Sequence, residues 1–194
     1  MTDTAEINLT AEIERLRAEV ETLRTQIHLL EQRAEAAEAA ADYDVLTPAL
    51  NRRGFVHALN KTIAWCARYN TPAVLLYLDL DGFKAVNDTH GHAAGDAALV
   101  RVARLLLDNV RETDAVGRMG GDEFCLLMLN AGLEEGREKA LRLAATLAAD
   151  GFEWQGEKAE LGGSFGVRAW ENHSDAEIWL AEADAAMWVR KRSR

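Results

Sequence analysis

Residues 118–128 read RMGGDEFCLLM, a stretch that places a glycine pair and two acids before an apolar run. Apolar segments flank the glycines, residues 115–118 and 123–129, and they predict a β-hairpin with Gly120 and Gly121 in its turn. Such a turn would give a ligand close access to the backbone, because glycine has no side chain. The residues alone also fit an ordinary Gly-Gly hairpin followed by two solvated acids, and they do not decide between the two.

A second stretch, residues 78–96 (LDLDGFKAVNDTHGHAAGD), supplies a partner for the hairpin. Asp79 lies near the end of the apolar strand predicted over residues 71–80, where a carboxylate is costly unless a positive group meets it. If this strand pairs with the second strand of the hairpin, Asp122 or Glu123 comes near Asp79. Clustered carboxylates suit Mg²⁺ or Mn²⁺ bound together with ligand phosphates. Taken alone, Asp79 is better explained as a turn cap.

Polar residues after this strand have the groups that guanine requires. Its N1–H and exocyclic amine need an acceptor such as Asp96, and its O6 or N3 needs a donor such as Asn87. Lys84 could contact a phosphate as a point charge. The alternative is that Asn87 is a turn residue and Asp96 lies in the first turn of a helix, where an anion is favoured.

Helices and strands are interleaved through the rest of the chain. Together they predict an α/β fold, with a mixed central sheet and helices packed on it. Ser174 and Glu177 have the spacing of a capping box at the start of the last helix. The predicted helices cover residues 51–69, 93–110, 133–149 and 174–192, and the predicted strands cover residues 71–80 and 161–170 in addition to the hairpin.

Residues 1–42 differ from the rest, with ten acidic and four basic residues and no glycine or proline. Apolar residues recur in alternating steps of four and three, which is a heptad repeat. Ile13, Val20 and Ile27 at position a, with leucine at d, favour two parallel strands. The sequence therefore predicts a parallel dimeric coiled coil over 1–42 and a globular domain over 43–194, although a single solvated helix is the alternative. Opposite charges across the predicted interface are Glu12–Arg17, Glu19–Arg24 and Arg33–Glu38.

The composition limits the partners and the location. The net charge of −10 disfavours nucleic acid and anionic lipid as partners. Cys66 and Cys125 lie in apolar segments and suit reduced, buried thiols. No apolar signal stretch opens the chain and no segment reaches the roughly 18 apolar residues of a membrane span, so a cytoplasmic location without membrane contact is predicted.

The motifs together resemble the GGDEF family of diguanylate cyclases, over residues 44–191. The signature pentapeptide is unaltered at residues 120–124, and residues 79–96 keep every fixed position of the family pattern DxDxFKxxNDxxGHxxGD. Three further segments are similar with changes. DVLTPALNRRGF resembles DxLTGLxNRR with Pro-Ala for Gly-Leu, GGSFGV resembles TxSxGV with glycine for threonine, and ADAAMWVRK resembles ADxALYxAK.

The resemblance implies a fold like that of nucleotide cyclases and polymerase palm domains. It implies an enzyme that converts two GTP into cyclic di-GMP and two pyrophosphates with Mg²⁺ or Mn²⁺. The implied metal ligands are the carboxylates of Asp79, Asp122 and Glu123 and the carbonyl of Leu80, with Asp122 and Glu123 as the catalytic pair and Asp122 matching the proton acceptor. The implied substrate-binding residues are Asn87 and Asp96 at guanine, His92 also at the substrate site, Lys84 and Lys191 at the phosphates, and Gly120 and Gly121 against the nucleotide.

The chemistry implied by the resemblance needs two domains. Each holds one GTP, and the 3′-hydroxyl of one GTP must attack the α-phosphate of the other, so the domains must stand face to face. Metal ions neutralise the developing charge and a carboxylate assists removal of the hydroxyl proton. A coiled coil would raise the effective concentration of one domain near the other.

Residues 111–114, RETD, match the inhibitory RxxD pattern of the family. The match implies product binding, with Arg111 gripping guanine or phosphate and Asp114 accepting from guanine N–H. The four residues alone also fit the charged end of a surface helix. The family's Gly-Arg-Asn tail is not present before Arg194, so Arg192 or Arg194 would have to replace its phosphate-binding arginine, or the affinity for GTP would be lower.

Three hypotheses follow from these observations. The first is a homodimeric diguanylate cyclase under product inhibition. The second is a non-enzymatic receptor that binds cyclic di-GMP through Arg111 and Asp114, and the third is a coiled-coil scaffold with a silent domain. The intact acids argue against a pure receptor, which would not need them.

Overall fold

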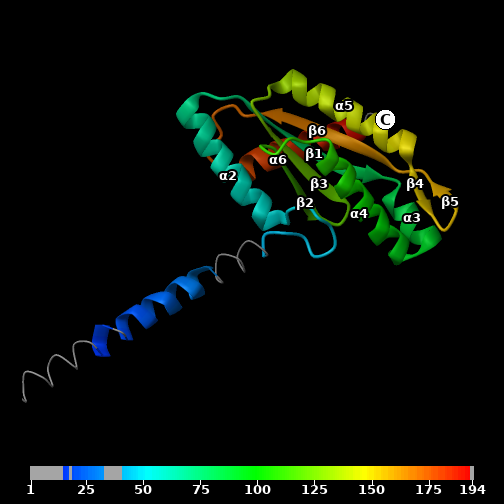
Figure 1. Cartoon of the computed structure of the whole chain (residues 1–194). Helices are drawn as coiled ribbons and strands as arrows, with labels where there is room; N and C mark the ends of the chain where they lie inside the picture. Colours follow the sequence, from blue (N-terminus) through cyan, green and yellow to red (C-terminus); the bar gives the residue numbers. More distant parts are fainter. Residues whose placement is uncertain (1–14, 18, 33–40, 193–194) are drawn as a thin grey trace, which may run out of the picture. The chain divides into compact units, whose positions relative to one another are not determined.

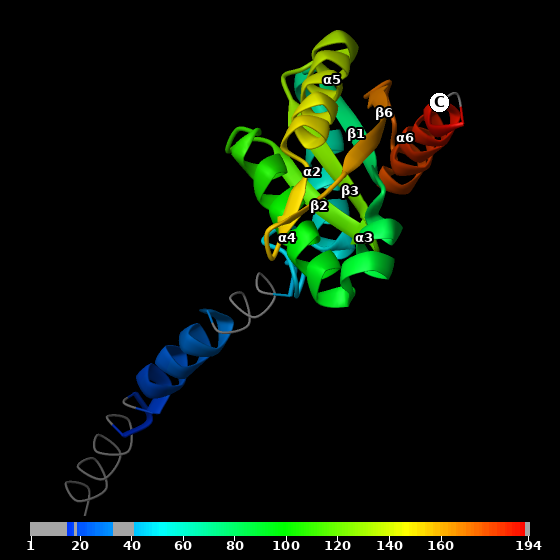
Figure 2. The same cartoon turned by 90° about the vertical axis from the view of Figure 1, so that its right-hand side faces the viewer.

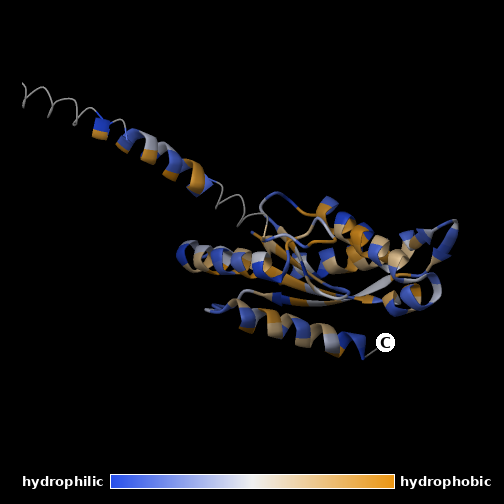
Figure 3. Cartoon of the chain, turned by 90° about the horizontal axis from the view of Figure 1, so that it is seen from below, coloured by the Kyte–Doolittle hydropathy of each residue, from blue (hydrophilic) through white to orange (hydrophobic). Residues whose placement is uncertain are grey.

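The computed structural model describes residues 15–17, 19–32 and 41–192. The chain divides into two compact units, Met1–Ala41 and Asp42–Arg194 (Figure 1). In the first unit, residues 15–17 and 19–32 are helical, and blue and orange residues alternate along this helix in Figure 3. Much of the predicted heptad repeat, including Ile13 and residues 33–40, lies outside the described residues.

A four-stranded sheet in the order β2-β3-β1-β6 forms the centre of the second unit. Its strands are β1 (Ala73–Asp81), β2 (Ala115–Gly120), β3 (Glu123–Leu129) and β6 (Gly162–Ala169). The α/β class is confirmed, and so is the hairpin of β2 and β3. All pairings between these strands are antiparallel, whereas the sequence predicted a mixed sheet. Among the described residues, parallel pairing is limited to one isolated bridge between Leu50 and Gly117.

Helices cover both faces of this sheet. They are α2 (Arg52–Tyr69), α3 (Phe83–His90), α4 (His92–Asp108), α5 (Leu133–Asp150) and α6 (Ala176–Lys191). In Figure 2, α4 and α5 lie on one side of the strands and α6 lies on the other. The sheet is buried on both faces, which agrees with the continuous apolar run of β1.

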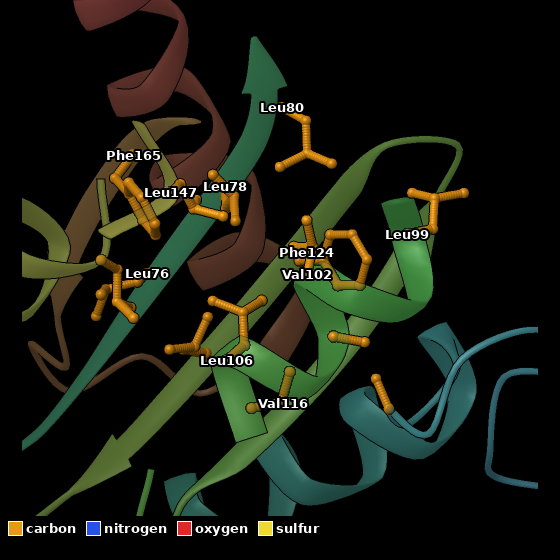
Figure 4. Close-up of a cluster of buried hydrophobic side chains, with 14 of the residues drawn as sticks. Leu76, Leu78, Leu80, Leu99, Val102, Leu106, Val116, Phe124, Leu147 and Phe165 are labelled. Carbon is orange, nitrogen blue, oxygen red and sulfur yellow. The ribbon is translucent and has the colours of Figure 1, made fainter. Parts of the chain in front are cut away.

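Two apolar clusters fill the space between the layers. Strand side chains alternate between the faces, so Leu76 and Leu78 pack toward α4 and α5, while Leu75 and Tyr77 pack toward α2 and α6. Figure 4 shows the first cluster, in which Leu78 from β1 lies beside Leu147 and Phe165, and Phe124 from β3 lies beside Val102 of α4. The alternation therefore decides which side chains of β1 face α6 and which face α4 and α5.

Several elements differ from the sequence predictions. The sequence analysis predicted neither helix α3 nor the short hairpin of β4 (Phe152–Trp154) and β5 (Glu157–Ala159). The last helix is capped by Asp175, whose carboxylate accepts from the N–H of Glu177. The predicted cap at Ser174 was therefore wrong by one residue, because Asp175 is placed with the extended backbone of an N-cap.

The cysteine prediction is confirmed, since Cys66 and Cys125 are free and buried. Burial raises the pKa of both thiols, so they are poor nucleophiles. Within the described ranges, none of the helices is long and apolar enough to cross a membrane.

Candidate active site

Acidic groups lie close together where β1 ends beside the start of β3. Asp79 of β1 lies directly opposite Glu123 of β3 in the antiparallel register. The N–H of Leu80 donates to the carbonyl of Asp122 at 3.3 Å, which ties the hairpin turn to the end of β1. The strand pairing predicted from sequence is thus confirmed, and it brings Asp79, Asp122 and Glu123 into one region.

The glycine turn has an open surface and a backbone with positive φ angles. Gly121 has φ of +49° and Gly120 has φ of +154°, and a Cβ atom at either position would meet nothing within 4 Å. Positive φ of this kind favours glycine. The open space leaves room for a ligand to approach the backbone there, which is one of the two alternatives that the sequence left open.

Arg118 holds this turn in place. Its guanidinium donates to the carbonyl of Gly121 through Nε at 3.0 Å and Nη2 at 2.8 Å. Its Nη1 donates to Asp44 Oδ1 at 3.1 Å. Burial would raise the pKa of Asp44, but hydrogen bonds from Thr47 and Arg118 outweigh it, so the pKa is lowered. The opening segment of the domain is therefore linked through one arginine to the backbone beside Asp122.

Helix α6 adds a cation and a further acid to the same region. The Lys191 ammonium forms an ion pair with Asp79. Asp79 is only 8% exposed, so the pair supplies the positive group that a carboxylate at this position requires. Asp184 Oδ1 is the one buried side-chain polar atom without a hydrogen-bond partner in the part of the chain that the structure describes.

The electrostatic surroundings disfavour full ionisation of these acids. Burial, followed by the charge of Asp79, raises the pKa of Asp122. Burial also raises the pKa of Glu123, and the charges of Asp184, Asp79 and Asp122 act in the same direction. The pKa of Asp184 is raised by burial and by Asp79. The region therefore has an excess of negative charge that a cation would relieve.

The donor set fits a hard divalent cation. Asp79, Asp122 and Glu123 offer carboxylate oxygens, and Leu80 offers a backbone carbonyl, which are the ligands that Mg²⁺ and Mn²⁺ prefer. Within residues 15–17, 19–32 and 41–192, however, no group of three or more His, Cys, Asp or Glu side chains is gathered closely enough to hold an ion. Such a site would therefore need oxygens from a bound ligand, as Mg²⁺ sites that use substrate phosphates do.

The predicted guanine-binding residues lie on α3 and α4. A Cβ atom on Gly95 would come within 2.1 Å of Asn87 Oδ1, so the Asn87 carboxamide rests directly on the backbone of α4. Asp96 is the next residue and is exposed, as is His92 at the start of the helix. Asn87 is helical and Asp96 lies beyond the first turn of α4. The alternative explanations by turn and helix-dipole effects therefore fail for these residues.

The basic residues expected at the phosphates have different positions. Lys84 is exposed in the first turn of α3, and Lys191 lies in the last turn of α6 beside Asp79. Although burial acts in the opposite direction, Asp79 raises the pKa of Lys191, so this side chain stays charged. Arg192 is the C-cap of α6, and Arg194 lies outside the described residues.

Arg111 and Asp114 lie at the opposite end of the hairpin from the acids. Asp114 Oδ1 accepts from the N–H of Leu129, the last residue of β3, at 3.2 Å, and Oδ2 accepts from the N–H of Arg111 at 3.0 Å. The carboxylate thus has a structural role in closing this end of β3. A hollow of about 200 Å³ adjoins the pair. Its charged lining residues are Arg111, Asp114, Glu135, Glu138, Lys139 and Arg142.

Three residues that the sequence analysis did not single out contact or face the acids. Arg118 donates hydrogen bonds to the carbonyl of Gly121 in the turn. Tyr77 donates a hydrogen bond to Glu123 Oε2 at 3.1 Å. Asp184 has a buried carboxylate oxygen without a hydrogen-bond partner among the described residues. A sequence signal existed for all three. Asp184 stands at a fixed position of the segment ADAAMWVRK, which resembles ADxALYxAK. Arg118 stands just before the glycine pair, and Tyr77 interrupts the leucines of β1 with the only hydroxyl of the strand.

Comparison with known proteins finds related sequences and structures. Residues 41–194 match the model of a family described as diguanylate cyclase, GGDEF domain. A curated relative, diguanylate cyclase DosC of Escherichia coli (strain K12), is 36% identical over 159 residues. The match covers 81% of this chain and 35% of DosC, so the chain spans about a third of that relative's length.

Solved structures share the fold. A sensory box/GGDEF family protein from Caulobacter crescentus is 36% identical with a TM-score of 0.75, and the match covers 79% of this chain and 100% of that chain. A microbial GGDEF domain studied for its interaction with cyclic di-GMP is also 36% identical, with a TM-score of 0.69. That match covers 79% of this chain and 94% of the other.

Proposed function

The chain belongs to the diguanylate cyclase GGDEF-domain family, and from this membership we propose that it condenses two GTP into cyclic di-GMP and two pyrophosphates. One observation carries the proposal: Asp79 and Glu123 lie opposite each other at the ends of β1 and β3. Asp122 adjoins them in a turn with open space above its glycines. Acids gathered beside an open turn support metal-assisted phosphoryl transfer, with substrate phosphates completing the metal site.

The acids would hold Mg²⁺ or Mn²⁺. Asp79, Asp122 and Glu123 would supply carboxylate oxygens, and Leu80 would supply its carbonyl. The bound metal would neutralise charge that develops on the phosphates. Asp122 would accept the proton of the attacking 3′-hydroxyl, since burial and Asp79 raise its pKa toward the range of a useful general base.

The nucleotide would lie between the glycine turn and helices α3 and α4. Asp96 would accept from guanine N–H groups and the Asn87 amide would donate to the ring, since Asn87 rests on the backbone next to Asp96. His92 would lie at the same site. Lys84 and Lys191 would contact phosphates. The Lys191 ammonium has three N–H donors, so it can bind a phosphate oxygen and stay paired with Asp79.

The decisive experiment is incubation of the protein with GTP and Mg²⁺ followed by chromatography of the nucleotides. We expect cyclic di-GMP and pyrophosphate in a ratio of one to two, and no product when the metal is removed by a chelator. Binding of cyclic di-GMP without turnover at any protein concentration would contradict the proposal and favour a receptor.

We propose that the first unit mediates homodimerisation through a parallel coiled coil over residues 1–42. Five apolar residues at a and d positions lie in the described helix, and each is between 44% and 62% exposed. Such exposure is unfavourable unless a second helix covers it. A second copy of the chain fits because the seam repeats in heptads. The five residues are Leu16, Val20, Leu23, Ile27 and Leu30.

A charge in this seam should separate the two copies. We expect Leu23→Glu to convert a dimer into a monomer and to lower specific activity about 100-fold in dilute solution, because tethering supplies the local concentration. Thr25→Glu is the matched control, since Thr25 lies outside the seam. Light scattering and the concentration dependence of the rate measure both effects. A monomeric parent protein would refute the coiled coil.

We further propose that cyclic di-GMP binds at Arg111 and Asp114 and inhibits the enzyme. The adjoining hollow carries Lys139 and Arg142 as additional cations, which suits a ligand with two phosphates. Asp114 keeps unused lone pairs, because a carboxylate accepts about four hydrogen bonds and two are assigned here.

Removal of the arginine should relieve inhibition without slowing the reaction. We expect Arg111→Ala to raise the cyclic di-GMP concentration for half-inhibition about tenfold or more, since a charge-assisted hydrogen bond is lost. The initial rate should not change, because Arg111 lies at the far end of the hairpin. Arg137→Ala, on the exposed face of α5, is the control. Unchanged inhibition in Arg111→Ala would exclude this site.

A further inference from the structure

Tyr77 occupies a position from which it can act on the acids of the candidate site. It lies in the middle of β1 and is 6% exposed. Its side chain is on the same face as Asp79, because residues two apart on a strand share a face. In the register it lies opposite Cys125, while Glu123 lies opposite Asp79. Glu123 is therefore the diagonal neighbour of Tyr77, within reach of an aromatic side chain.

The hydroxyl of Tyr77 forms a hydrogen bond with Glu123. It donates to Glu123 Oε2 at 3.1 Å, across 46 residues of sequence. The bond occupies one carboxylate oxygen, and no donor among the described residues contacts Oε1. A glutamate held by one oxygen loses most of its rotational freedom, which would otherwise oppose ligand binding.

Glu123 needs such a restraint because its charged neighbours repel it. Asp184, Asp79 and Asp122 are all close enough to act on it electrostatically. Lys191, the cation that α6 brings to the acids, is already paired with Asp79. Repulsion would therefore turn the Glu123 carboxylate outward into solvent if the hydroxyl were absent.

We propose that Tyr77 is a positioning residue that holds the Glu123 carboxylate ready for a divalent cation. The inference rests on the proposed function and adds to it a residue outside every family motif quoted above. A hydrogen-bond partner behind a metal ligand typically affects metal affinity by 10- to 100-fold. The competing explanation is that Tyr77 only fills the apolar cluster between the sheet and α2 and α6.

The variant Tyr77→Phe separates these explanations, because it keeps the ring and removes the hydroxyl. The probe is Mn²⁺, titrated into the full chain with 3′-deoxyGTP, which lacks the attacking hydroxyl, and free Mn²⁺ is measured by electron paramagnetic resonance. We expect about tenfold weaker Mn²⁺ binding in Tyr77→Phe. The control is Tyr69→Phe, because Tyr69 is 52% exposed and packs on Trp65. This variant should bind Mn²⁺ like the parent.

A double-mutant cycle tests whether the effect passes through Glu123. In the background of Glu123→Ala, the change Tyr77→Phe should have no further effect on Mn²⁺ binding. The inference is overturned if Tyr77→Phe binds Mn²⁺ within twofold of the parent, or if its effect persists in Glu123→Ala. A parent protein that binds no Mn²⁺ with 3′-deoxyGTP would instead refute the metal site and, with it, the proposed function. Thermal unfolding of each variant confirms that it is folded.

Discussion

Asp122→Asn is expected to lower the formation of cyclic di-GMP by about 10³-fold, because it removes both the proton acceptor and a charged metal ligand of the proposed site. The substitution preserves the size of the side chain and its place in the turn. The backbone contact between Asp122 and Leu80 is also preserved. The loss should therefore appear in turnover and leave the proposed dimer intact.

Stability should change in the opposite direction from activity. The pKa of Asp122 is raised in the folded chain, first by burial and then by Asp79, so the folded state binds this proton more tightly than the unfolded state. Ionisation at neutral pH therefore costs folding free energy. A neutral asparagine removes that cost, and we expect the melting temperature of Asp122→Asn to equal or exceed that of the parent.

The control for this prediction is Asp108→Asn, the same chemical change at the exposed last residue of α4. It should leave turnover unchanged. Turnover is measured by the pyrophosphate released per protomer, and stability by calorimetry. An Asp122→Asn protein that retains a tenth or more of the parent rate would show that Asp122 is not the proton acceptor.

The central strands could be predicted from sequence because their signals are strong and local. The apolar run of β1 and the glycine pair between β2 and β3 fix both the strands and their turn. The pairing of Asp79 with Glu123 followed once the hairpin was placed against β1. The parallel component of the sheet was predicted wrongly, because each helical connection joins strands that are not neighbours. Strand β3 lies between β1 and β2, and β1 lies between β3 and β6, so every neighbouring pair is antiparallel.

Other features depend on contacts that a linear pattern does not show. Helix α3 has only eight residues and contains asparagine, aspartate and threonine, which favour turns over helix interiors. Glycines at both of its ends define it. The bond from Tyr77 to Glu123 depends on the register of β1 and β3, and the position of Asp184 depends on how α6 lies across the sheet.

The close packing of α6 on the sheet depends on Gly166 in β6, which has no side chain. A Cβ atom there would lie 2.0 Å from the carbonyl oxygen of Ala183 and 2.4 Å from the amide nitrogen of Met187. Both atoms belong to the backbone of α6, so a rotation of a side chain cannot relieve the overlap. The helix would have to move away from the sheet, and Asp184 and Lys191 would move with it.

Gly166→Ala is therefore expected to destabilise the fold by about 3 kcal/mol, the upper end of the usual cost of overpacking. For a domain of this size that corresponds to a fall of roughly 6–12 °C in melting temperature. The control is Gly162→Ala in the same strand, where the new Cβ would lie 3.5 Å from Asp81 Cβ, an ordinary contact, and the change should stay within about 0.5 kcal/mol. Calorimetry of both variants measures the difference. If Gly166→Ala melts within 2 °C of Gly162→Ala, α6 does not pack on β6 at this distance, and the placement of Lys191 beside Asp79 loses its support.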